Sequence, residues 1–197
     1  MTDTRHLAWF RQAREAGPGW NLAKTIAQVV AFWFAFLVAI PRGLLALERL
    51  WGIPPLPVPI GPFPIWLVLV AASALGLASG ATLAVHGAGT PLPLDAPRRL
   101  VIRGPYRYVR NPMAIAGLTQ GACVALLLES WFGLALVAAG FVVWNYVVRP
   151  MEEAHLELVF GEEFTAYREH VRCWLPSRRR PGLGARAATP TGDRSPG

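Results

Sequence analysis

The stretch PMAIAGLTQGACVALLLESWFGLALVAAGFVVWNYVV, which runs from Pro112 to Val148, decides the fold of this chain. Its only charged residue is Glu129, near the middle. A helix needs about 20 mostly apolar residues to cross the hydrocarbon core of a bilayer, and each half of the stretch approaches that length. We therefore predict two membrane spans, 112–128 and 131–148, joined by a tight turn at Glu129-Ser130.

Two further uncharged windows, 25–40 and 65–85, lie nearer the N-terminus. We predict spans over 22–40 and 65–85, and the first is expected to end before Pro41 because proline interrupts a helix. Between Gly43 and Pro64, GLLALERLW could form a helical turn on the membrane surface, but the six prolines that follow prevent a continuous helix, and we predict a loop at the membrane interface. Outside the membrane domain, 21–176, we expect an interfacial arm over 1–20 and a disordered basic tail over 177–197.

The composition favours a membrane protein over a nucleic-acid-binding one. Hydrophobic residues make up 53% of the 197 residues and charged residues only 16%, although the net charge is +7. Lysine and arginine are absent from 112–148 and gather before the first span, between the second and third, and after the fourth. By the positive-inside rule, both termini are cytoplasmic, and orientation alone explains most of these arginines. The arginine-rich, lysine-poor composition hints at a bacterial inner membrane.

Beyond the fourth span, apolar residues recur at intervals of three and four between Leu156 and Trp174, which predicts an amphipathic helix over 151–174 with a bend at Gly161. The predicted fold class is all-α: a polytopic membrane protein with about four transmembrane helices and a cytoplasmic C-terminal amphipathic helix. Cys123 and Cys173 lie far apart, and the histidines are scattered, so no metal site is expected.

Two polar segments flank the hairpin. Residues 98–117 hold five arginines and two tyrosines, and 148–163 hold five of the nine glutamates. The hairpin returns both segments to one face of the membrane, so they must be neighbours. Arg103 and Arg110 could pair with Glu152 and Glu153 as a scaffold, and a helix start after Pro150 could be capped by one carboxylate. A pocket for a cationic or ammonium-bearing ligand explains the cluster equally well.

These segments resemble the integral-membrane methyltransferases that include isoprenylcysteine carboxyl methyltransferase and the phospholipid N-methyltransferases. The resemblance lies in GTPLPLDAPRRLVIRGPYRYVRNPMAIAG (Gly89 to Gly117) and EEAHLELVFGEEFTAYREHVRCWLP (Glu152 to Pro176). It covers roughly the C-terminal half and joins a G-x-Y-x-x-x-R-[HN]-P loop to a Glu-Glu pair followed by FGEE-[FY]-x-x-Y. The N-terminal two spans carry no motif of this kind.

The resemblance implies S-adenosyl-L-methionine as methyl donor and a lipid or lipophilic small molecule, drawn from the bilayer, as acceptor. Leu100 and Val101 would line the cofactor through their backbones, and Tyr106 would pack against it. Glu152, with Glu153 beside it, would receive the ammonium of the cofactor. The loop residues expected to wrap the cofactor are Asn111, Pro112 and Met113. The candidate catalytic residues are Arg149, near a substrate-contacting arginine of the carboxyl methyltransferases, and Arg110.

Two departures from the family pattern concern the acceptor. Asn111 stands where the carboxyl methyltransferases have histidine, and Ala114 replaces the usual tyrosine. The acceptor atom therefore stays open between a carboxylate oxygen, which needs no base, and an amine, for which His155, Tyr106 or a glutamate is a candidate base. The alternative to an enzyme is a non-catalytic membrane scaffold or lipid-binding protein of the same fold. A transporter is disfavoured, because the predicted spans lack the charged residues typical of an ion or substrate pathway.

Overall fold

The computed structural model describes residues 18–87 and 99–176, and every regular element in these two ranges is a helix. The first long helix comprises α1 (Pro18–Trp33), the π-helical segment η2 (Phe34–Ala39) and α2 (Ile40–Leu50). It is followed by α3 (Pro62–His86), the 3-10 turn η4 (Gly104–Arg107) and α4 (Pro112–Leu127). The last elements are α5 (Trp131–Val143), the π-helical segment η5 (Trp144–Val148), α6 (Arg149–Phe160) and α7 (Glu162–His170).

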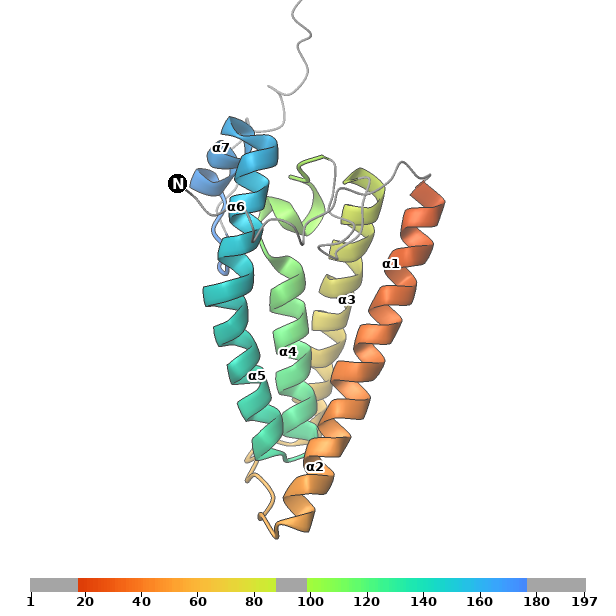
Figure 1. Cartoon of the computed structure of the whole chain (residues 1–197). Helices are drawn as coiled ribbons and strands as arrows, with labels where there is room; N and C mark the ends of the chain where they lie inside the picture. Colours follow the sequence, from red (N-terminus) through yellow and green to blue (C-terminus); the bar gives the residue numbers. More distant parts are fainter. Residues whose placement is uncertain (1–17, 88–98, 177–197) are drawn as a thin grey trace, which may run out of the picture.

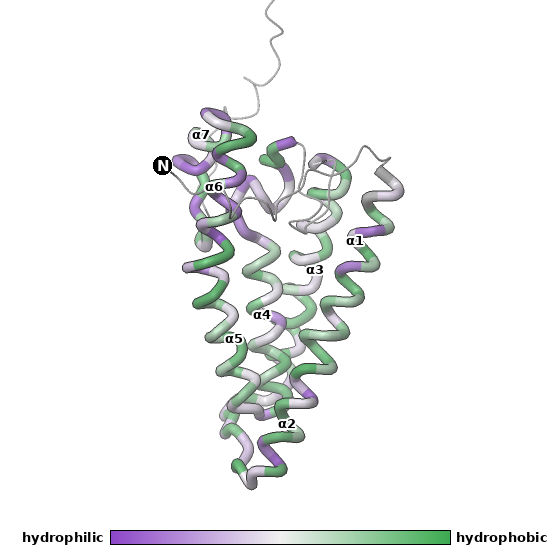
Figure 2. The backbone as a smooth tube through the Cα atoms, in the orientation of Figure 1, coloured by the Kyte–Doolittle hydropathy of each residue, from purple (hydrophilic) through white to green (hydrophobic). Residues whose placement is uncertain are grey.

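The long helices run alternately up and down, so α1 begins at the end of the bundle where α6 and α7 lie (Figure 1). We call this the α7 end, and the opposite end, at Glu129 and Ser130, the hairpin end. Three helices, Leu22–Leu50, Pro62–His86 and Trp131–Phe160, are long and apolar enough to cross a membrane, and α4 is a shorter apolar helix. Figure 2 shows hydrophilic residues gathered at the α7 end and apolar ones along the bundle. The all-α polytopic prediction is confirmed, while the predicted tail and nearly all of the predicted arm lie outside the described residues.

The first membrane helix does not end before Pro41, as the sequence predicted. It continues without a break from Leu22 to Leu50, so the predicted span end at residue 40 is wrong, and the predicted loop begins at Trp51 rather than at Gly43. The π-helical segment η2 lies just before the proline, and the amide of Ile40 donates to the carbonyl of Ala35. Membrane helices tolerate proline where such local π adjustments satisfy the freed backbone groups.

The fourth membrane helix passes through Pro150 in the same way. The amide of Arg149 donates to the carbonyl of Trp144, and the helix runs from Trp131 to Phe160. Its 30 residues span about 45 Å, more than the roughly 30 Å hydrocarbon core, so α6 extends beyond the membrane. The predicted separate helix start at Met151 is therefore wrong, whereas the predicted bend at Gly161 is confirmed by its φ of 51°.

Small residues bring α3, α4 and α5 close together. A Cβ added to Gly76 of α3 would lie 3.4 Å from Cβ of Ala116, and one added to Gly133 of α5 would lie 2.9 Å from Cβ of Ala125. Gln120 of α4 also donates to Ser73 Oγ of α3 at 2.9 Å. Small side chains permit this close approach of membrane helices, so α4 packs closely against both α3 and α5.

A buried carboxyl group joins the first helix to the hairpin. Glu48 of α2 is 3% exposed, and its Oε1 accepts a hydrogen bond from Ser130 Oγ at 3.1 Å and another from the amide of Phe132. Ser130 Oγ in turn accepts from the amide of Gly133 at 2.9 Å. Glu48 thus satisfies the free amide of Phe132 at the start of α5, and Ser130 satisfies that of Gly133. Sequence reasoning missed this contact, because Glu48 fell in the predicted interface loop.

Candidate functional site

A cavity of about 650 Å³ opens between the first helix, α4 and the α5–α6 helix. At the α7 end it is bounded by the loop 99–111 and by α7. The cavity brings together residues that the sequence predicted separately. These are the predicted cofactor residues and one predicted catalytic residue: Leu100, Val101, Tyr106, Asn111, Pro112, Met113, Glu152, Glu153 and Arg110.

The loop before α4 is held on two sides. Gly104 has a φ of +53°, and a Cβ at this position would lie 2.8 Å from Thr82 Oγ1 of α3. Only glycine combines that backbone conformation with so close an approach. On the other side, the amide of Arg110 donates to the carbonyl of Arg172 at 3.0 Å. The loop is therefore fixed between α3 and the segment that follows α7.

The helix α7 closes the site over this loop. Phe164, Tyr167 and Val171 form a buried apolar cluster against which Leu100, Ile102, Leu156 and Phe160 pack. The hydroxyl of Tyr167 donates to the backbone carbonyl of Tyr106 at 2.6 Å. The FGEE-x-x-x-Y sequence thus has a structural role: Gly161 turns the chain, and Phe164 and Tyr167 return to hold the loop that carries Tyr106.

The acidic pair lies on α6, inside a continuous helix. Because this helix has no free N-terminus near Pro150, capping does not explain Glu152 or Glu153, and that interpretation is wrong. Arg110 Nη1 lies 2.9 Å from Glu153 Oε1, so the predicted scaffold pair is present for Glu153. Among the described residues, Glu152 and Arg103 form no ion pair.

The Arg110–Glu153 pair leaves hydrogen-bonding capacity inside the cavity. Despite the short separation, Arg110 Nη1 and Glu153 Oε1 are not aligned as a hydrogen bond, and both atoms are buried, as is Arg110 Nε. None of the three has a hydrogen-bond partner among the described residues. Buried polar groups are usually satisfied. Because Nη1 and Oε1 still neutralise each other as an ion pair, Arg110 Nε is the atom that is left to bind a polar ligand.

The two tyrosines of the site are held in the protonated form. Burial, and to a smaller extent the charge of Glu152, raise the pKa of Tyr106 well above its ordinary value. Burial also raises the pKa of Tyr167, although Arg110 opposes this shift. A phenol with so high a pKa does not act as a base near neutral pH. Tyr106 is therefore no longer a candidate for the general base, and His155 and the glutamates remain candidates.

The start of α4 forms the floor of the polar part of the cavity. Asn111 precedes the helix and donates from Nδ2 to Cys173 Sγ at 3.3 Å, rather than capping α4 with its side chain. Pro112 occupies the first turn, where its missing amide hydrogen costs nothing. Met113 faces α3, with Cε 3.8 Å from a Cβ position on Gly80. The predicted wrapping loop is thus tied to the segment after α7.

Arg149 is the predicted site residue that the structure does not bring to the cavity. Its Nε donates to the carbonyl of Asn145, one turn back on its own helix, at 3.3 Å. Arg149 is absent from the cavity wall, whereas Val148 and Glu152 belong to it. Its contact with a substrate remains a prediction.

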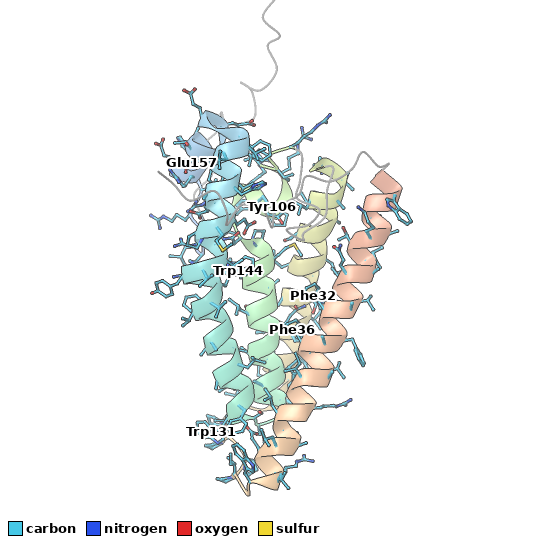
Figure 3. All side chains as sticks on the ribbon, viewed as in Figure 1. Phe32, Phe36, Tyr106, Trp131, Trp144 and Glu157 are labelled. Carbon is cyan, nitrogen blue, oxygen red and sulfur yellow. The ribbon has the colours of Figure 1, made fainter. Side chains whose placement is uncertain are left out.

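Sequence reasoning missed the wall that the first helix contributes. Gln28, Phe32 and Phe36 line the cavity from α1 and η2, opposite Trp144 of η5. The ring centroids of Phe32 and Phe36 lie 5.7 Å apart in a stacked arrangement, and Figure 3 shows both residues on the side of the first helix that faces α4. The sequence feature that could have indicated this wall is Gln28, a polar residue within an apolar span.

Away from the α7 end, the cavity wall becomes mostly apolar, with Gln120 of α4 as a polar member whose Nε2 donates to Ser73 Oγ. Along α5 it is formed by Gly140, Val137, Leu136 and Gly133, and across from them by Phe36 and Leu37. The stretch from Trp144 to Gly133 corresponds to about 16 Å of helix, roughly half the thickness of the hydrocarbon core. The cavity therefore joins a charged chamber at the α7 end to an apolar groove at membrane depth.

The chain matches a known protein family. The sequence pattern of a family described as phospholipid methyltransferase matches residues 63–163, just over half of the chain. The matched region runs from the start of α3 to the start of α7 and includes the loop 99–111 and both glutamates of the acidic pair. No curated protein matches the chain.

Proposed function

Since the chain belongs to the phospholipid methyltransferase family, we propose that it transfers a methyl group from S-adenosyl-L-methionine to a lipid or another membrane-partitioned small molecule. One observation carries the proposal: a single cavity joins a chamber containing carboxylates and Arg110 to an apolar groove at membrane depth. A water-soluble cofactor and a lipophilic acceptor can meet only in a space of this kind.

The residues of the chamber suit the cofactor. Bound there, it would supply an electrophilic methyl group on a sulfonium. Its amino-acid part carries an ammonium and a carboxylate, which match the carboxyl group of Glu152 and the Nε of Arg110, whose Nη1 is already paired with Glu153. Leu100 and Val101 supply the loop backbone, and Tyr106 the packing surface. A carboxylate pair also favours the positive charge of the sulfonium.

The chain's own contribution to the reaction is mainly orientation and exclusion of water. Phe164 and Tyr167 close the chamber, and the apolar wall formed by Phe32, Phe36 and Leu136 presents the acceptor from the bilayer side. Holding two reactants in alignment can lower a barrier by about 7 to 11 kcal/mol. The distribution of arginines supports placing the α7 end, with both termini, on the cytoplasmic side of a bacterial inner membrane.

The test is binding of labelled S-adenosyl-L-methionine to the full chain in proteoliposomes. Glu152→Gln should weaken binding at least tenfold, because a hydrogen bond to a charged group contributes about 1.5 to 3 kcal/mol. Glu157→Gln is the matched control, since Glu157 is an exposed residue of the same helix, paired with Arg168 at 3.1 Å and outside the cavity wall. Figure 3 shows Glu157 at the outer side of α6.

Transfer of the labelled methyl group to a total membrane lipid extract, followed by identification of the product, then fixes the acceptor and its atom. The absence of cofactor binding, or equal cofactor binding by Glu152→Gln and the wild type, would refute the proposal that the protein is a methyltransferase. Lipid binding without cofactor binding would instead support the scaffold or lipid-binding alternative.

A further inference from the structure

Five glycines line the cavity, and one of them differs from the rest. Cβ atoms added to Gly76, Gly121, Gly133 and Gly140 would contact a side chain of a neighbouring helix, at distances between 2.9 and 3.7 Å. A Cβ added to Gly117 of α4 would have nothing within 4 Å among the described residues. Contact between helices therefore accounts for a small residue at the first four positions and not at Gly117.

The backbone does not require glycine at position 117 either. Gly117 lies inside α4, and the positive φ values among the described glycines belong to Gly52, Gly104 and Gly161. Glycine destabilises the interior of a helix relative to alanine. Alanine would therefore be the better residue at position 117 unless its methyl group collided with an occupant of the cavity. Glycine is the usual residue where a backbone must approach a ligand closely.

The helical register shows that position 117 faces the cavity. Residues three and four positions apart lie on the same side of a helix. For Gly117 these residues are Met113, Ala114, Gln120 and Gly121, and all four belong to the cavity wall. The helix α4 lies between the first helix and α5 and packs against both η2 and α5 (Figure 1), so it forms the floor of the cavity. A side chain at position 117, which is exposed, would therefore enter the cavity.

Gly117 lies where the chamber meets the groove. Pro112, in the loop proposed to wrap the cofactor, is five residues away, which corresponds to about 8 Å along the helix. The nearest polar side chain on this face, Gln120, already donates to Ser73 Oγ. The charged and titratable residues of the described wall belong to the loop 99–111 and to α6 and α7: Arg99, Tyr106, Arg110, Glu152, Glu153, His155 and Tyr167. The part of an occupant that touches Gly117 is therefore apolar.

We propose that Gly117 is a specificity-determining residue, whose missing side chain admits a methyl acceptor with a ring or a branched carbon next to its reacting atom. The inference rests on the proposed function and adds the shape of the acceptor to it. In a cavity of about 650 Å³, an unbranched chain has room to pass beside an alanine methyl group, so it would not require glycine. A broad framework fills the width between the first helix and α5 and needs the space at Gly117.

The test is photolabelling of the full chain in proteoliposomes without cofactor. Two diazirine probes have the same carbon number and a single hydroxyl group, which ends a straight chain in one probe and is carried by a terminal cyclohexyl ring in the other. The variants are Gly117→Ala and Gly117→Leu. Gly43→Leu is the matched control, because Gly43 is an exposed helical glycine with nothing within 4 Å of an added Cβ and lies outside the cavity wall.

We expect the ring probe to label the cavity wall of the wild type and of Gly43→Leu, and to label Gly117→Ala about tenfold less. Gly117→Leu should lose at least as much. The straight-chain probe should label the wild type, Gly43→Leu and Gly117→Ala equally, which shows that the groove remains folded. Undiminished labelling of either Gly117 variant by the ring probe would overturn the inference. Equal loss of both probes in Gly117→Ala, a similar loss in Gly43→Leu, or a wild type that the ring probe does not label would also overturn it.

Cofactor binding and methyl transfer, measured on the same proteoliposomes, separate this inference from the proposed function. Gly117→Ala should leave the affinity for S-adenosyl-L-methionine within about twofold of wild type. A loss of cofactor affinity as large as the loss of labelling would place the cofactor against Gly117 and overturn the assignment to the acceptor. Failure of cofactor binding in every protein, with selective labelling intact, would refute the methyltransferase and keep the size selection. In an active enzyme, Gly117→Ala should raise the half-saturating lipid concentration about tenfold, and an unchanged value would refute the role of Gly117 alone.

Discussion

The hydrogen bonds of Glu48 predict a specific pattern of stability losses at the hairpin end. Glu48→Leu should destabilise the fold far more than Glu48→Gln. In the wild type, Glu48 Oε1 accepts from Ser130 Oγ and from the amide of Phe132 in a buried setting. Leucine leaves both donors without a partner, whereas glutamine keeps an oxygen that can accept.

The size of the effect follows from counting these donors. Each buried group left unpaired costs about 1 to 3 kcal/mol, so Glu48→Leu should lower the free energy of unfolding by about 2 to 6 kcal/mol. Glu48→Gln loses mainly the favourable interaction of a negative charge with the start of α5, about 0.3 to 1 kcal/mol. Along the helix, Ser130 lies about 33 Å from Glu152, so cofactor affinity should not change in the glutamine variant.

Thermal and denaturant unfolding in detergent micelles would measure the losses, and hydrogen exchange at the amides of Phe132 and Gly133 would locate them. Glu129→Gln is the matched control, since Glu129 is an exposed residue in the same turn whose hydrogen bonds are made by its backbone, from the amide of Leu56 at 2.7 Å and to the carbonyl of Leu126 at 3.1 Å. The reasoning fails if Glu48→Leu unfolds like Glu48→Gln, or if Glu129→Gln loses as much stability as Glu48→Leu.

Three further variants test other contacts of the structure. Gly133→Ala should lower the free energy of unfolding by about 1 to 3 kcal/mol, because the added Cβ would lie 2.9 Å from that of Ala125. Gly117→Ala is the control: a Cβ there would have nothing within 4 Å, so thermal unfolding should detect no loss of stability. Tyr167→Phe removes the hydrogen bond to the Tyr106 carbonyl. It should lower the free energy of unfolding by about 1 kcal/mol and weaken cofactor binding, measured by calorimetry, several-fold. Tyr108→Phe, at an exposed position, should change neither stability nor cofactor binding. Arg149→Gln should leave cofactor binding intact; an increased half-saturating lipid concentration would show that the side chain leaves the Asn145 carbonyl to contact the acceptor.

The hairpin and the charged chamber were predictable from sequence because each depends on a local signal. The span limits near 112, 128 and 131 follow from Pro112 and from the Glu129-Ser130 turn, and the structure places the helix ends within one residue of them. The hairpin also guarantees that the loop 99–111 meets α6, so the meeting of Arg110 with Glu153 could be predicted. The sequence could not predict the places of Gln28 and Trp144 in the cavity wall or the contact of Glu48 with the hairpin. These depend on how the first helix is rotated and tilted against the others.

The two prolines that misled the sequence reasoning belong to the construction of the site. Pro41 and Pro150 each follow a π-helical segment at the same spacing, two residues after its last member, Ala39 or Val148. One extra residue in a turn rotates the face of the helix that follows by about 100°. The helix stays continuous through the extra residue, but a different set of its side chains then faces the cavity.

Both π-helical segments contribute directly to the cavity wall, η2 through Phe36 and Leu37 and η5 through Trp144 and Val148. Because α6 is a rigid continuation of α5 rather than a separate helix, Glu152 and Trp144 sit at a fixed separation on one element. The carboxyl group proposed to bind the methyl donor and the indole that lines the cavity nearer the groove are therefore held in register by a single helix. Such preorganisation is what a reaction dominated by alignment requires.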